Sequence, residues 1–337
     1  MSAQYAPEVV KDLRQMVEQG LSHWGLSPVC SIELLNLSEN ATFALSDPDT
    51  QRELVLRVHR VGYSSAQEIR SELEWIEALR QSGTIDTAAP FTGVDGERVQ
   101  VLVSPRGKAT RFAVAFERLP GAEPDFHRDA VRWFERLGEL TARLHQHAKA
   151  WPLPRHFRRR RWDLNAMVGP GAYWGTWRAA LGLDLTGASV LERALTLIGE
   201  RLQRFGSAPE RFGLIHADLR LANLLVDDMH LRIIDFDDCG FSWFLYDFAT
   251  AVSFIEEQPI VPALLHSWLA GYVRVAPLSG DERAEIPTFV VLRRIVLSAW
   301  LASHNEVSFA QQFGVAHTQG TVHLAQQLLD GSFLIDA

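Results

Sequence analysis

The chain has 337 residues, 47% of them hydrophobic and 22% charged, which is the composition of a folded globular protein and not of a disordered one. This length is sufficient for two lobes or domains. The formal net charge of −8 argues against a general nucleic-acid binder, and two cysteines, Cys30 and Cys239, are too few for a disulfide framework. We expect a cytoplasmic protein without a membrane partner, because the N-terminus has no signal core and the most apolar run contains Arg293 and Arg294.

The first 116 residues predict a small sheet. The expected elements are a helix over residues 6–24, strands near 31–37, 42–45 and 53–58, a helix to about residue 80, and strands near 99–104 and 112–116. Ser65 and Glu68 have the spacing of a capping box, which marks the start of the second helix.

The segment Glu117–Gly121 contains Pro and Gly, which interrupt both helices and strands. After it the apolar spacing predicts helices near 129–148, 189–205, 244–255, 262–273, 283–303 and 317–330. The sequence therefore predicts an α+β protein, with an N-terminal part over residues 1–118 and a larger, mainly helical part over residues 119–337.

The segment 212–238 interrupts the helical pattern. Two apolar β-type runs, Leu224–Val226 and Leu231–Ile234, flank the turn Asp227–His230 and predict a hairpin. Asn223 precedes the first strand and Asp235 follows the second, so both polar groups are expected at the open end of the hairpin.

The polar residues around this hairpin have the chemistry that phosphoryl transfer requires. The transferred group carries dense negative charge, so divalent cations must be held against it, and magnesium prefers oxygen ligands such as those of Asn223 and Asp235. A separate carboxylate must orient the acceptor hydroxyl and take its proton, and Asp218, five residues before Asn223, fits that role. The alternative is a polar hairpin whose aspartates only cap turns.

The pattern of His216, Asp218 and Asn223, followed by Asp235-Phe and by Tyr246-Asp247, resembles the catalytic and metal-binding loops of the protein-kinase-like superfamily. More specifically it resembles the aminoglycoside/choline-type phosphotransferase family, and within it homoserine-kinase-like and stress-response-kinase-like members. The resemblance implies a two-lobed protein-kinase-like fold, with ATP and Mg²⁺ as cofactors. It implies nucleotide binding by the N-terminal lobe, and catalysis and acceptor binding by the C-terminal lobe.

The resemblance also implies supporting roles for nearby residues. Asp237 matches a second acidic position, either a metal ligand or a solvated turn carboxylate. His216 matches a histidine that braces the loop, and Asp247 an acid that ties the loop down or caps a helix. The role of Arg220 is inferred from its position instead: because it lies two residues after Asp218, it either offsets charge on the transferred group or is an exposed loop arginine.

Two N-terminal positions depart from the kinase pattern. Arg57 stands on the third strand where kinases place lysine, with Glu72 expected as its partner; its alternative is a surface charge. The polar loop Ser38–Thr42, which contains Asn40, replaces the glycine-rich loop. In the family the backbone of the joint, here from Glu117 to Leu119, holds adenine.

The length of the segment between Asp235 and Asp247 indicates the class of acceptor. Only eleven residues separate Asp235 from Asp247, too few for the activation segment of a protein kinase, and no A-P-E motif follows. We therefore expect a small-molecule hydroxyl acceptor, such as an amino acid, an amino alcohol or an aminoglycoside. A protein serine/threonine kinase and a nucleotide-binding regulator with little catalysis remain alternatives.

The sequence leaves the roles of two charged segments undecided. The basic run Arg155–Arg161 has a local structural role, a substrate-facing role or a nucleic-acid role. Glu256 and Glu257 either attract an amine or lie in solvent at the end of a helix.

Overall fold

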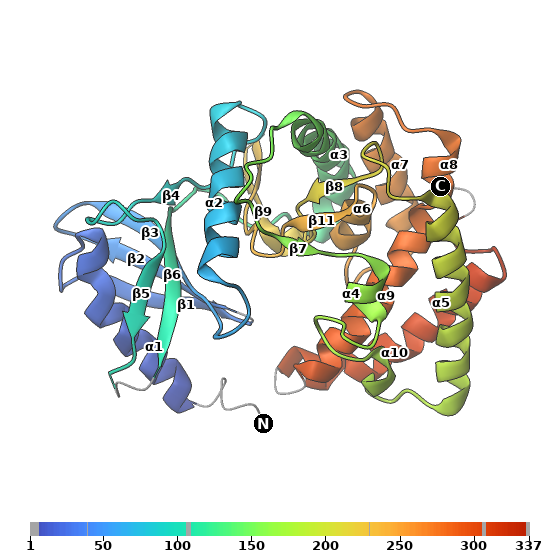
Figure 1. Cartoon of the computed structure of the whole chain (residues 1–337), viewed down its shortest axis with the longest axis horizontal. Coiled ribbons are helices and arrows are strands. Elements are labelled where there is room, and N and C mark those ends of the chain that lie inside the picture. Colours follow the sequence, from blue (N-terminus) through green and yellow to red (C-terminus); the bar gives the residue numbers. More distant parts are fainter. Residues whose placement is uncertain (1–6, 39, 106–108, 229, 305–307, 335–337) are drawn as a thin grey trace. The chain divides into compact units, whose positions relative to one another are not determined.

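The structure is a computed structural model that describes residues 7–38, 40–105, 109–228, 230–304 and 308–334. It divides into two compact units (Figure 1). Unit 1 is Met1–Pro120 with Leu153–Arg158, and unit 2 is Gly121–Pro152 with Arg159–Ala337. The segment Leu153–Arg158 was expected in the second part of the chain and belongs to the first unit instead.

Unit 1 is built around an antiparallel sheet. Its elements are α1 (Pro7–Gly20), the 3-10 helix η2 (Leu21–Trp24), β1 (Ser31–Leu37), β2 (Ala41–Asp47), β3 (Arg52–Val58), α2 (Ala66–Gln81), β4 (Pro90–Phe91), β5 (Gln100–Val103) and β6 (Thr110–Glu117). The strand order is β1-β2-β3-β6-β4, and β5 also pairs with β6. The capping box of Ser65 and Glu68 forms at the start of α2 as predicted. The two-residue strand β4 was not predicted, because it is too short to show alternation.

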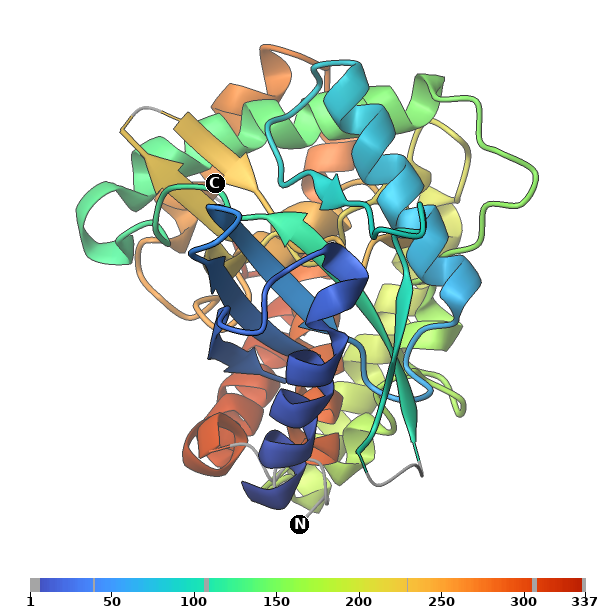
Figure 2. The ribbon, with the colours of Figure 1, turned by 90° about the vertical axis from the view of Figure 1, so that its left-hand side faces the viewer.

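Alternation along β3 decides which side chains face each helix. Leu54, Leu56 and Val58 lie in the same apolar core as residues of α1. Because side chains alternate along a strand, Arg57 points to the other face, where it contacts α2. The two helices therefore cover opposite faces of the sheet (Figure 1), and Figure 2 looks onto the face that α1 covers.

Unit 2 is mainly helical. Its helices are α3 (Phe126–Ala150), α4 (Leu164–Val168), η3 (Trp177–Ala179), α5 (Leu185–Phe205), η4 (Leu221–Asn223), α6 (Tyr246–Ala251), α7 (Val261–Val273), α8 (Gly280–Ala284), α9 (Ile286–Ser303) and α10 (Ser308–Leu329). Its strands are β7 (Arg160–Arg161), β8 (Phe212–Ile215), β9 (Leu224–Asp227), β10 (His230–Ile233) and β11 (Gly240–Trp243). Strands β9 and β10 form a hairpin, and a second small sheet has the order β7-β11-β8.

Several helix predictions were wrong in their extent, and the helix expected over 244–255 is only α6, Tyr246–Ala251. The single helix expected over 283–303 is interrupted at Glu285, and α9 begins at Ile286 with a proline in its first turn. Proline fits the first turn of a helix but not its interior, so the chain restarts the helix there. Helix α10 begins at Ser308 instead of near residue 317.

Helix α9 is the central core helix of unit 2. Among the described residues, the stretch Gly280–Ser303 is long and apolar enough to cross a membrane by length and composition, but 78% of its most apolar window is buried inside the protein. Helices α5, α6 and α10 all pack against α9. Burial on all sides is the pattern of a core helix.

His317 connects α10 to α9, because its Nε2 lies 3.3 Å from the Arg294 carbonyl oxygen. Burial, followed by the positive charge of Arg294, lowers the pKa of His317 from 6.5 to about 3. Below pH 6.5 the unfolded chain therefore binds a proton that the folded chain rejects. We expect this group to lower the free energy of unfolding by up to about 1.4 kcal/mol per pH unit as the pH falls from 6.5 toward 3. Urea unfolding of the wild type and His317→Gln at pH 7, 6 and 5 measures this slope; equal slopes in both proteins would contradict the expectation.

Candidate active site

The β9–β10 hairpin brings the predicted metal-binding positions to its open end. Leu224 pairs with Ile233 in the antiparallel register, and the Ile234 N–H donates to the Asn223 carbonyl at 2.9 Å. Asn223 therefore directly precedes one strand of the hairpin, and Asp235 follows the other, as predicted. Met229, in the predicted turn, lies outside the described residues.

The backbone is strained on both sides of the hairpin. Ala217, directly before Asp218, has φ 67°, and Asp235 has φ 63°, in the left-handed region that non-glycine residues rarely adopt. Such backbone persists only where surrounding contacts fix it, and it occurs often at functional sites.

Asp247 supplies the contacts that fix the loop before the hairpin. Its buried carboxylate accepts hydrogen bonds from the Ala217 N–H at 2.7 Å and from the His216 N–H at 3.2 Å. His145 contacts the same carboxylate at 3.1 Å. The residue at the N-cap of α6 is Leu245, so Asp247 serves the loop and does not cap the helix.

His216 braces the same loop through its buried side chain. Its Nδ1 accepts a hydrogen bond from the Asp218 N–H at 3.2 Å, and its Nε2 lies 3.1 Å from the Ile234 carbonyl oxygen. One ring thereby links the loop that carries Asp218 to the strand end that precedes Asp235.

The Asp218 carboxylate has donors on both oxygens. Oδ2 accepts from the Asn223 amide at 2.7 Å and from Arg220 Nε at 3.2 Å, and Oδ1 accepts from Arg293 Nη2 at 2.8 Å. Burial raises the pKa of Asp218, but the positive charges of Arg220 and Arg293 outweigh burial and hold that pKa below its usual value. Asp218 is therefore a carboxylate at neutral pH, as an acceptor of the hydroxyl proton must be. Arg220 pairs with Asp218 and is not an unengaged loop arginine.

The side chains of the predicted metal set offer oxygen atoms, which are the donors that a hard divalent cation binds. The Asn223 amide nitrogen donates to the Asp218 carbonyl and carboxylate, which leaves the amide oxygen as the atom of Asn223 that can bind a cation. Asp237 is buried, which excludes the alternative of a solvated turn carboxylate. The described part of the chain has no cluster of three or more His, Cys, Asp or Glu side chains for a metal. Magnesium in phosphotransferases needs only one or two carboxylates, because substrate phosphates and waters complete its shell.

The basic run contacts the segment that follows Asp235. Arg159 Nε donates to the Cys239 carbonyl at 2.6 Å, and another nitrogen of Arg159 donates to the Asp237 carbonyl. Arg160 lies 3.6 Å from Asp238. These buried contacts favour the local structural role for the run over nucleic-acid binding.

In unit 1, Arg57 and Glu72 form a buried ion pair, with Arg57 Nη2 2.5 Å from Glu72 Oε1. Arg57 is therefore not a surface charge of the sheet. Its guanidinium also lies 5.4 Å from the centre of the Phe116 ring. An arginine paired with a glutamate is the arrangement that the predicted phosphate contact requires.

The other predicted nucleotide-binding residues also lie in unit 1. Asn40 is buried, and its side-chain oxygen accepts from the Arg60 N–H at 3.1 Å. Glu117 ends β6 with an exposed side chain, and Leu119 is half-buried after it. Glu39, in the predicted polar loop, lies outside the described residues. Nucleotide binding by these residues stays a prediction.

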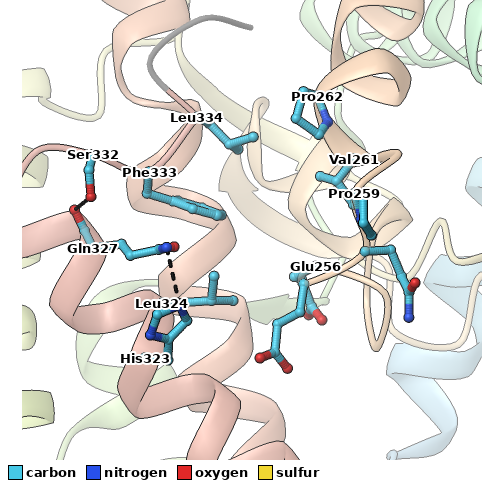
Figure 3. Close-up of a pocket in the computed structure, with 12 residues that line it drawn as sticks. Glu256, Pro259, Val261, Pro262, His323, Leu324, Gln327, Ser332, Phe333 and Leu334 are labelled. Carbon is cyan, nitrogen blue, oxygen red and sulfur yellow. Dashed lines mark hydrogen bonds between the residues drawn. The ribbon is translucent and has the colours of Figure 1, made fainter.

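Unit 2 contains a separate cavity of about 550 Å³ between the start of α7 and the end of α10 (Figure 3). His323 and Gln327 line one side and are hydrogen-bonded to each other. Glu256 and Glu257 also line the cavity, but each forms an ion pair with Arg294. Glu256 is buried and is not a solvated helix end, and Arg294 already supplies a positive charge to both carboxylates.

Comparison with known proteins gives consistent similarities. Residues 32–278 match the phosphotransferase enzyme family. The chain is 40% identical to the structure of a microcompartment-associated aminopropanol kinase, with a TM-score of 0.88 over 95% of this chain and 99% of that one. It is 25% identical to an amicoumacin kinase of Bacillus subtilis over 86% of this chain and 87% of the relative. The structure of amicoumacin kinase hAmiN in complex with AMP-PNP, Ca²⁺ and Ami has a TM-score of 0.78 at 20% identity, covering 98% of both chains.

Proposed function

Because the chain belongs to the phosphotransferase enzyme family, we propose that it transfers the γ-phosphate of ATP to the hydroxyl group of a small amino alcohol, with aminopropanol as the first candidate. The observation that carries this proposal is the 40% identity to an aminopropanol kinase along 95% of the chain. Family membership confirms the predicted protein-kinase-like fold and the predicted phosphotransferase activity toward a small-molecule hydroxyl.

In the proposed mechanism Asp218 accepts a hydrogen bond from the acceptor hydroxyl, orients it for attack and takes its proton late. Arg220, which donates to the same carboxylate, offsets charge on the transferred phosphoryl group. Asp247 and His216 keep the loop in its strained conformation, so that Asp218 needs little rearrangement for reaction.

The cofactors in this proposal are ATP and a divalent cation, which we assign as Mg²⁺. Asn223, Asp235 and Asp237 would hold the cation, which neutralises charge on the phosphates. Arg57, oriented by Glu72, would contact the phosphates of ATP.

The remaining nucleotide contacts involve the loop and the joint of unit 1. In this proposal Asn40 lies in the loop that contacts the nucleotide, and the backbone of Glu117 and Leu119 holds adenine. Cys30 and Cys239 are buried and form no disulfide, which is compatible with the reducing cytoplasm that we propose as the location of the protein.

An acceptor panel tests the substrate class. ADP release from Mg·ATP is measured with aminopropanol, ethanolamine, homoserine, an aminoglycoside and a generic protein substrate. Propylamine and 2-propanol serve as matched controls, because each lacks one of the two functional groups. We expect kcat/KM for aminopropanol to exceed that of 2-propanol by at least about 100-fold, because a site built for a polar group rejects an analogue that lacks it. Preferential stimulation by the aminoglycoside or the protein substrate would contradict the amino alcohol assignment.

A further inference from the structure

Arg293 is one of two adjacent buried cations in a mainly apolar helix. It lies on α9 and is 3% exposed, beyond the residues 32–278 that match the phosphotransferase enzyme family. Removing an arginine from water is costly unless a counter-charge compensates, and an apolar side chain of similar volume often stabilises a core at least as well. A buried arginine at this position therefore calls for an explanation other than packing.

The contacts of Arg293 converge on Asp218. Its Nη2 donates to Asp218 Oδ1 at 2.8 Å, while its Nε donates to the Ser253 hydroxyl at 3.1 Å. The guanidinium also lies 5.3 Å from the centre of the Trp174 ring and 6.0 Å from that of Tyr246. The guanidinium is thus fixed by three segments: the loop of Asp218, the stretch from Tyr246 to Ser253, and the segment of Trp174. Its N–H group toward Asp218 therefore has a defined direction.

The two oxygens of Asp218 are held from different parts of the fold. Asn223 and Arg220, both in the loop that carries Asp218 or directly after it, donate to Oδ2. Oδ1 accepts from Arg293, which is 75 residues further along the chain. Donors within the loop move together with it, whereas Arg293 anchors the carboxylate to the central helix of unit 2.

We propose that Arg293 is a positioning residue of the phosphotransfer reaction, which fixes the rotation of the Asp218 carboxylate relative to the acceptor hydroxyl. This inference rests on the proposed role of Asp218 and not on the identity of the acceptor. A carboxylate without this anchor still lies in the site, but it presents its oxygens to the hydroxyl in several orientations. The consequence is a loss of kcat with little change in the KM for ATP.

The test is a double-mutant cycle on kinetics. Arg293→Gln should lower kcat by about 10- to 100-fold, which is the cost of a small misplacement of a catalytic group, and Arg293→Lys should recover part of that loss. In the Asp218→Asn background, Arg293→Gln should cause no further loss, because the carboxylate on which it acts is gone. An equal loss in both backgrounds would overturn the proposal.

A neighbouring arginine provides the matched control. Arg294 is also 3% exposed on α9 and also ion-paired, but its partners are Glu256 and Glu257. Arg294→Gln should lower the melting temperature while kcat stays near the wild-type value. If Arg294→Gln and Arg293→Gln lower kcat equally, both effects are those of a damaged core and the proposal fails.

Two further measurements keep the test decisive. Ser253→Ala removes one hydrogen bond from Arg293 and keeps the test available if Arg293→Gln does not fold. It should lower kcat by about 2- to 10-fold when residue 218 is aspartate and should have no effect in the Asp218→Asn background. The cycle of Arg293 and Asp218 is also read by melting temperature without an acceptor. If the melting-temperature shifts of the two single variants simply add in the double variant, the pairing of Arg293 with Asp218 is overturned. If the shifts do not add but no acceptor of the panel stimulates ADP release, only the amino alcohol assignment is contradicted.

Discussion

Asp218→Asn is expected to lower kcat by about 10²- to 10⁴-fold, the usual contribution of a positioned general base, with unchanged affinity for ATP. Asparagine has nearly the same shape, but its single amide oxygen can accept from only one side, either from Arg293 or from Arg220 and Asn223. It also cannot take a proton from the acceptor hydroxyl. Steady-state ADP release measures kcat, and isothermal titration with ATP measures affinity.

Asp238→Asn is the control for this variant. Asp238 is also a partly buried aspartate, and it lies 3.6 Å from its own arginine partner, Arg160. We expect it to keep wild-type kcat. Transfer at the wild-type rate by Asp218→Asn would remove Asp218 from the role of base.

Asp235→Ala is expected to abolish the dependence of ATP binding on Mg²⁺. The variant loses a carboxylate at the open end of the hairpin. Loss of a residue that only supports a metal ligand lowers metal affinity about 10- to 100-fold, and loss of the ligand itself should lower it at least as much. The affinity for ATP is measured with Mg²⁺ and with EDTA, and the ratio of the two should approach one in the variant.

Asp227→Asn is the matched variant for that experiment. Asp227 ends β9 at the turn of the same hairpin, where it lies 3.6 Å from Arg232. It should bind Mg·ATP as the wild type does. Unchanged Mg·ATP affinity in Asp235→Ala would rule out a metal role for Asp235.

Local patterns predicted much of this fold. The capping box of Ser65 and Glu68, the strands of unit 1 and the β9–β10 hairpin each depend on residues within a few positions of one another. The motif around Asp218 has the same property, because its spacing is fixed by one loop and one hairpin. Such features follow from backbone geometry and turn chemistry, which the sequence displays directly.

Long-range partners were not predictable in the same way. Arg293 was interpreted only as a charge that interrupts an apolar run, because the carboxylate that it pairs with lies 75 residues earlier. Arg159 was part of an unassigned basic run for the same reason, since its acceptors are carbonyls near residue 239. Periodicity shows that a side chain is buried, but it does not identify the partner that makes a buried charge tolerable.

Glu256 illustrates how burial changes an interpretation. A pair of glutamates near a helix end was expected either in solvent or facing an amine. Burial raises the pKa of Glu256, and the Arg294 charge opposes that rise. The sequence contains both residues, but only the packing of α9 against the segment before α7 brings them together.

The central claim is that Asp218 serves transfer of phosphate from ATP to the hydroxyl of a small amino alcohol. The most direct measurement is ³¹P NMR of the products formed from Mg·ATP and aminopropanol by the wild type and by Asp218→Asn. We predict a phosphate monoester of aminopropanol with the wild type and almost none with the variant. ADP without a phosphorylated alcohol, or equal amounts of the ester from both proteins, would contradict the account.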